Sequence, residues 1–239
     1  TDVQALYGKT LSADITARSG FVMPYFGAGA YSNNYLVEAF GNPTYPTFNV
    51  NYISDYGYTV AAAIPLSSDN NTSFGMAGRS AKRWGGNQDI NVLSLVGSST
   101  QNILDQYFTD HGNGNALDLS LMTTLSGSLK PTFSFVWLDV GDTRYQMTSG
   151  VQDPPSQKNN LIFGASIQHD FALASWTHSL EYKFISTNNE DFSKKIHLGT
   201  EASYGMIDLR AGLNQGYLTY GAGVDLWLLQ VDAAIYATE

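Results

Sequence analysis

The last third of the chain alternates between apolar and polar residues with a period of two. The pattern holds over residues 196–204, 206–214 and 218–226, and in the second of these Leu209 and Leu213 are separated by polar or small positions. Such alternation predicts β-strands whose two faces meet different surroundings. Because the polar side carries charges and many glycines, the pattern favours a barrel with lipid outside and a polar lumen.

The same criterion predicts twelve strands along the chain. They cover residues 9–18, 22–31, 50–65, 73–83, 115–125, 131–140, 160–171, 174–186, 194–204, 206–214, 217–227 and 229–238. We therefore predict an all-β fold, a transmembrane antiparallel up-and-down β-barrel forming a single domain over residues 1–239.

The connections between these strands alternate in length. Longer ones are expected at residues 32–49, 84–114, 141–159 and 187–193, and most of the others are short turns. Outer-membrane barrels place tight turns on the periplasmic side and long loops outside. With twelve strands both termini fall at the long-loop end. We therefore expect a missing strand at each end and fourteen in the complete barrel, with an extra strand at residues 35–40, or only ten strands, as alternatives.

The longest loop is expected to contain one short helix. Ser99 is a suitable N-cap, and the residues after it have apolar positions at helical spacing. The apolar stripe consists of Ile103, Leu104, Tyr107 and Phe108. Such a helix either packs on the rim or mouth of the barrel or serves as a gate or plug.

Composition agrees with a membrane barrel. Charged residues make up 14% of the 239 residues, compared with about 25% in typical soluble domains. The net charge of −9 argues against nucleic acid as a partner, and the absence of cysteine excludes disulfides and thiolate sites. No run of 18 apolar residues is present. We expect a bacterial outer-membrane protein exported with a cleaved signal peptide that is not part of this sequence.

Charged residues recur at inward positions of the predicted strands. Adjacent strands lie about 4.8 Å apart, so inward carboxylates and cations can pair laterally. The predicted network consists of Asp14, Arg79, Asp118, Glu181, Lys183, Glu201, Asp208, Arg210, Asp225 and Asp232. It is expected either to fill a narrow lumen with ion pairs or to select permeants in a polar conduit.

Large apolar residues occupy the opposite, outward positions. The predicted lipid-facing set is Tyr52, Tyr58, Leu119, Leu121, Trp176, Leu180, Phe184, Leu209, Leu213 and Val224. Many tyrosines and tryptophans fall near predicted strand ends, where they are typical of the interfaces of a bilayer.

No pattern indicates an enzyme, a cofactor or a metal site. The four histidines are scattered, and no Gly-x-Ser-x-Gly elbow is present. Asp139, Asp142 and Asp153 offer oxygen ligands for calcium, but their spacing matches no calcium loop and instead favours a strand-end turn. We therefore expect no catalytic residues, no cofactor and no metal.

Several segments resemble the conjugal-transfer F-type outer-membrane barrels, a branch of the long-chain fatty-acid transporter-like superfamily. The resemblance covers the chain in patches from Asp55 onward. The matching segments are Asp55-Tyr56-Gly57-Tyr58, Val136-Trp137-Leu138-Asp139-Val140-Gly141-Asp142-Thr143, Lys194-Lys195-Ile196-His197-Leu198-Gly199, Leu209-Arg210-Ala211-Gly212-Leu213-Asn214-Gln215-Gly216 and Ala234-Ile235-Tyr236. The resemblance implies a membrane barrel. It also implies an N-terminal Asn-Pro-Ala segment and a further strand after the last residue, and these two segments do not lie in this sequence.

The sequence favours a porin- or transporter-like barrel that interacts with membrane lipid and passes small hydrophobic or amphipathic molecules passively. The alternative is a structural barrel with a lumen filled by side chains and no transport. Small residues from Gly27 to Ala30 suit close packing between copies, so a homo-oligomer is a possible partner. A membrane-embedded hydrolase is a third, weaker alternative.

Overall fold

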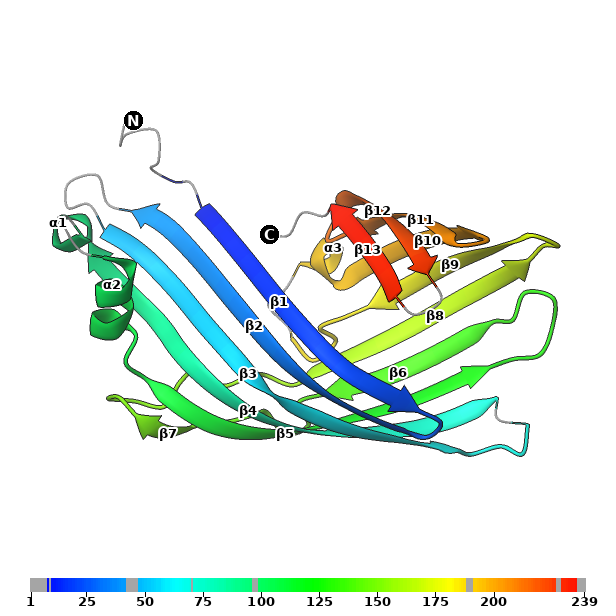
Figure 1. Ribbon diagram of the computed structural model, residues 1–239, viewed down its shortest axis with the longest axis horizontal. Coiled ribbons are helices and arrows are strands. Elements are labelled where there is room, and N and C mark those ends of the chain that lie inside the picture. Colours follow the sequence, from blue (N-terminus) through cyan, green and yellow to red (C-terminus); the bar gives the residue numbers. More distant parts are fainter. Residues whose placement is uncertain are drawn as a thin grey trace. The chain divides into compact units, whose positions relative to one another are not determined.

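The computed structural model describes residues 8, 10–41, 47–69, 71–95, 99–187, 191–226 and 229–235. Within these residues thirteen strands form one sheet, in which neighbouring strands are consecutive in the chain except that β7 pairs with β5 and β8 follows β6 (Figure 1). The strands are β1 (Thr10–Met23), β2 (Phe26–Gly41), β3 (Thr47–Pro65), β4 (Thr72–Asn91), β5 (His111–Thr124), β6 (Thr132–Leu138), β7 (Gln146–Ser149), β8 (Asn160–Asp170), β9 (Ala174–Tyr182), β10 (Ile196–Tyr204), β11 (Ile207–Asn214), β12 (Tyr217–Leu226) and β13 (Leu229–Ile235). The helices are α1 (Val92–Leu95), α2 (Thr100–Tyr107) and α3 (Phe192–Lys195). The predicted all-β, antiparallel, up-and-down organisation is confirmed.

The chain divides into two compact units. The first unit comprises Thr1–Ala62, Ala77–Leu117 and Gly141–Lys158, and the second comprises Ala63–Met76, Asp118–Val140 and Asn159–Glu239. The long strands β3, β4 and β5 contribute residues to both units. Strand pairing in the second unit is regular from β8 to β13, with each strand pairing antiparallel to the next.

The strands of the second unit have two chemically distinct faces. Since directly opposed residues of antiparallel strands project to the same side, the register defines these faces. We call one side the apolar face, after the opposed row Leu180, Leu198, Leu213 and Leu218, and the other the polar face, after the row Ser179, Gly199, Gly212 and Thr219. The apolar face is uncovered, since Leu209 is 59% exposed and Leu218 is 66% exposed.

A small hydrophobic core lies in the first unit, where helix α2 packs on the sheet. Val50, Ile90 and Phe108 are buried, and Ile103 and Leu104 of α2 pack against them. The Ser99 hydroxyl caps α2 by accepting a hydrogen bond from the backbone N–H of Asn102 at 3.2 Å. The predicted helix and its apolar stripe are thus confirmed.

The first hairpin differs from the prediction, which placed the first turn at Ser19 and Gly20. Strands β1 and β2 instead continue to Pro24 and Tyr25, and Tyr25 adopts a positive φ of 68°. Proline cannot donate to the ladder, so it ends the pairing. Gly20 lies within the hairpin, where a Cβ would meet the carbonyl oxygen of Ala28 at 2.7 Å. The extra strand considered at residues 35–40 is the continuation of β2.

Other boundaries also differ from the prediction. Strand β4 continues to Asn91, and the expected long loop after β6 contains β7. Strand β9 ends at Tyr182 rather than residue 186, because the backbone turns at Phe184, which has a φ of 55°. Residues 194 and 195 belong to helix α3 rather than to a strand. Residue 9, residue 227 and residues 236–238 of the predicted strands lie outside the described residues.

Candidate functional site

A buried ion pair joins β3 to β4 in the first unit. The Arg83 guanidinium donates from Nε to Oδ1 of Asp55 at 2.7 Å and from Nη2 to Oδ2 at 2.6 Å. The side chains are only 4% and 13% exposed, respectively. Two parallel hydrogen bonds fix both groups, and the low accessibility makes the pair costly to break on one side only.

The connection between β6 and β8 folds over this ion pair. We call residues 141–158 the docked loop. Arg83 donates from Nη1 to the carbonyl oxygen of Pro155 at 2.6 Å, and from Nη2 to Oε1 of Gln157 at 3.3 Å. The ring of Tyr145 lies 4.1 Å from the guanidinium carbon, a cation–π contact. One arginine therefore holds both the strand β3 and the loop.

Asp110 and two glycines of β5 provide a second anchor for the docked loop. The Asp110 carboxylate accepts hydrogen bonds from the backbone N–H groups of Val151 at 2.7 Å and Gln152 at 3.2 Å. A Cβ on Gly112 would meet Pro154 at 2.9 Å, and a Cβ on Gly114 would meet the ring of Tyr145 at 2.8 Å. Glycine is thus required on β5 for the loop to approach this closely.

Tyr145 is expected to make docking of this loop sensitive to alkaline pH. Tyr145 is only 4% exposed, and its burial raises its pKa from 10.0 to about 12. The folded protein favours the neutral phenol, so the contribution of Tyr145 to the free energy of unfolding is complete below pH 10. It is lost as the pH rises to about 12. Ultraviolet absorbance should show that one tyrosine fewer titrates late in Tyr145→Phe than in the native protein. An unchanged late titration in the variant would contradict this assignment.

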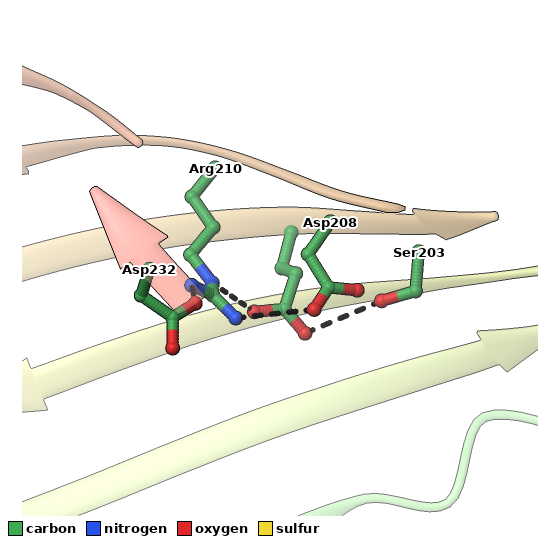
Figure 2. Close-up of polar contacts among 5 residues, drawn as sticks. Ser203, Asp208, Arg210 and Asp232 are labelled. Carbon is green, nitrogen blue, oxygen red and sulfur yellow. Dashed lines mark hydrogen bonds and ion pairs between the residues drawn. The ribbon is translucent and has the colours of Figure 1, made fainter. Parts of the chain in front are cut away.

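A second polar cluster lies on the polar face of the second unit. Arg210 on β11 donates from Nε to Glu201 on β10 at 2.5 Å and from Nη2 to Asp208 at 3.4 Å, and Nη1 pairs with Asp232 on β13. Figure 2 shows Asp208, from the same strand as Arg210, and Asp232, from β13, converging on the Arg210 guanidinium. We call these four residues the Arg210 cluster.

Strand register explains how one arginine reaches carboxylates on three strands. Glu201 is directly opposite Arg210, and Asp208 is opposite Gly223, which is opposite Asp232. A Cβ on Gly223 would lie 2.5 Å from Oδ1 of Asp232 and 3.3 Å from Nη1 of Arg210. The glycine therefore leaves space for the Arg210–Asp232 contact. Since three carboxylates share one cation, the cluster carries excess negative charge on the polar face.

The remaining residues of the predicted charge network are placed separately. Glu181 pairs with Lys183 at 2.8 Å, and Asp118 accepts a hydrogen bond from the backbone N–H of Asp139 at 2.7 Å. Asp225 is exposed near the end of β12. Asp14 and Arg79 lie in the first unit, where Asp14 accepts a hydrogen bond from the Thr16 hydroxyl at 3.3 Å. Of the ten predicted residues, only Glu201, Asp208, Arg210 and Asp232 form the cluster.

Most of the predicted lipid-facing residues project from exposed or half-buried positions. Two differ from the prediction. Tyr52 packs against the buried core of Val50, Ile90 and Phe108, and its ring centroid lies 5.4 Å from those of both Trp84 and Phe108. Phe184 lies beyond the end of β9. The other eight lie on strands, and of these Leu119 is half-buried and the rest are exposed: Tyr58, Leu119, Leu121, Trp176, Leu180, Leu209, Leu213 and Val224.

Two shallow grooves run along the polar face of the second unit. One, of about 510 Å³, extends from Thr177 and Ser179 to the Arg210 cluster. The other, of about 390 Å³, lies beside Ser134, Gly164 and His197. Small residues line both grooves because the rows that cross them consist largely of glycine, serine and threonine. Along these rows of the described strands, the polar face is therefore not filled by large side chains.

Comparison with known proteins provides no family assignment. No family model matches the chain, and a search of curated proteins found no matching sequence. In the described residues, no group of three or more histidine, cysteine, aspartate or glutamate side chains is arranged to hold a metal ion. No helix in the described part of the chain is both long and apolar enough to cross a membrane.

The sequence-based prediction missed the Asp55–Arg83 pair and the docked loop. A signal for the pair was present, since Asp55 alternates with the outward Tyr56 and Tyr58 and therefore belongs to the opposite side of β3. The position of the loop had no comparable signal, because Pro155 and Tyr145 are joined to Arg83 by tertiary contacts alone.

Proposed function

We propose that this protein is an integral β-barrel of the bacterial outer membrane that passes small hydrophobic or amphipathic molecules passively. The observation that carries the proposal is the division of the second unit into an uncovered apolar face and a polar face with open grooves. Large contiguous apolar surfaces are unusual on soluble monomers. Lipid contact is a direct explanation for the exposure of leucine and aromatic side chains on successive strands.

Backbone hydrogen bonding also supports a membrane location. A sheet satisfies its N–H and C=O groups between strands, so strands that close into a barrel can cross hydrocarbon without unpaired groups. The β10–β11 and β11–β12 hairpins pair along their whole lengths. Closure of the sheet, insertion into lipid and export to the outer membrane are parts of this proposal.

The lining of the grooves supports passage of solutes. Ser179, Gly199 and Gly212 lie in one row of the polar face, and none has a long side chain that would occupy the groove. The Arg210 cluster places fixed charges at one side of the same groove. Small polar walls admit amphipathic solutes, and the excess of carboxylates disfavours anions.

The docked loop favours a second candidate function, a structural barrel without transport. Arg83, Asp110 and Tyr145 hold this loop firmly against the strands of the first unit. A loop fixed in this way would narrow or close a lumen. Under this alternative the barrel would act through its outer surface, including assembly with further copies of the chain.

Conductance measurements on matched variants test the transport proposal. Ser179 lines both grooves, so Ser179→Phe introduces a large ring beside them, whereas Ala222→Phe introduces the same ring at an exposed position of the apolar face. In planar bilayers we expect channel conductance from the unmodified protein and from Ala222→Phe, with at least a twofold reduction for Ser179→Phe. Conductance no greater than that of protein-free bilayers would refute passage and favour the structural barrel.

A further inference from the structure

The first unit contains an apolar cavity of about 320 Å³ under helix α2, separate from the grooves of the polar face. Phe48 and Val50 of β3 and Ile90 of β4 form its floor, and Leu104 of α2 and Phe108 close it. The volume lies near the lower end of the range for small-molecule sites, about 300–1,000 Å³. Protein interiors are normally close-packed, so a space of this size beside a buried cluster needs an explanation.

Glu38 is the one charged side chain among the described residues that line this cavity. It lies on β2 directly opposite Val50 of β3, so both project to the side of the sheet that α2 covers. The Glu38 side chain is half-buried. A carboxylate at the margin of an apolar space strengthens binding of a hydrogen-bond donor or a cation and disfavours an anion.

The cavity is held in place by polar contacts at both ends of α2. Ser99 caps the helix at its start, and the Trp84 indole N–H donates to the backbone carbonyl of Phe108 just after its end. The Tyr107 hydroxyl donates to Ser94 of α1 at 2.9 Å. Because these contacts anchor both ends of the helix, the space beneath it is preformed and a ligand need not order the helix on binding.

We propose that this cavity binds a small single-chain amphiphile with a protonated amine head. The aliphatic chain lies among Val50, Ile90, Leu104 and Phe108, and the ammonium group pairs with the Glu38 carboxylate. The site selects amines over alcohols, and alcohols over carboxylates of the same chain length. It does not depend on solute passage through the polar face, so a protein without conductance can still have it.

Binding of octylamine, 1-octanol and octanoate to the full chain in lipid nanodiscs tests this site. Ligand-dependent shifts in thermal unfolding and tryptophan fluorescence give the affinities, with ligand-free and protein-free nanodiscs correcting for partition into lipid. At neutral pH we expect octylamine to bind about tenfold more tightly than octanol, with octanoate the weakest. Equal or tighter binding of octanoate would overturn the proposal.

Three variants localise the binding. Glu38→Gln is expected to remove the preference for octylamine over octanol while leaving octanol binding unchanged. Leu104→Trp fills the cavity and is expected to abolish binding of both, whereas Leu93→Trp, at a 73% exposed position on α1 outside the cavity, is a matched control. Unchanged octylamine binding in either Glu38→Gln or Leu104→Trp would overturn the assignment. The conductance of the unmodified protein tests the transport proposal separately.

Discussion

Arg83→Met is expected to lower the free energy of unfolding by about 3–5 kcal/mol, the usual cost of removing one member of a buried ion pair. The substitution leaves the Asp55 carboxylate, 13% exposed, without its two hydrogen bonds from Arg83. It also removes the donor to Pro155 and the cation beneath Tyr145. Urea unfolding in detergent micelles, followed by tryptophan fluorescence, measures this change. Hydrogen exchange should show the docked loop losing protection first.

Two further variants distinguish the ion pair from a general effect of losing charge. In Asp55→Asn/Arg83→Met the uncompensated carboxylate is absent, so most of the stability should return, although the loop should remain less protected. Lys82→Met removes a positive charge from the adjacent, exposed position and should change the stability by less than about 0.5 kcal/mol. If the double variant were as unstable as Arg83→Met, an unpaired carboxylate could not be the cause.

Local alternation predicted the strands well because it depends only on which side of the backbone each residue occupies. The segments 206–214 and 217–227 match β11 and β12 closely, and the direct opposition of Glu201 and Arg210 places them on the same face of the sheet, as their alternation predicts. To assign a side chain to a face, it is enough to know whether it occupies an odd or an even position along its strand. The short turns between these strands leave little freedom of register.

Features that depend on distant contacts were not predictable in the same way. The docked loop contacts Arg83 of β4 and Asp110, just before β5, through backbone groups of its own, the Pro155 carbonyl and the N–H of Val151, and such groups carry no sequence signal. The Arg210 cluster is smaller than the predicted ladder because the same face carries glycines at positions such as Gly221 and Gly223. Asp14 and Arg79, which the prediction placed in the same network, belong to the first unit.

Gly85→Ala is expected to disrupt the pairing of β3 with β4 at Gly85, which lies on β4 between Arg83 of the buried ion pair and Ile90 of the cavity under α2. Gly85 lies two residues after Arg83 on β4 and has a φ of 119°, a conformation that residues with a Cβ rarely adopt. A Cβ here would lie 2.0 Å from the backbone carbonyl oxygen of Tyr52, so the strands must separate. The N–H of Gly85 donates to the carbonyl of Asp110 at 3.1 Å, which links β4 to the start of β5.

The next residue supplies a close control for this prediction. Gly86 is also buried on β4, but a Cβ there would meet no atom within 4 Å, so Gly86→Ala should change stability by less than about 1 kcal/mol. Backbone strain alone costs about 1–3 kcal/mol, and the clash with Tyr52 adds to it. We therefore expect Gly85→Ala to lose at least about 3 kcal/mol in urea unfolding and to expose Trp84, with a red-shifted emission. Equal effects of the two alanines would show that neither the φ of Gly85 nor its contact with Tyr52 limits the fold, since these are the features that separate the two positions.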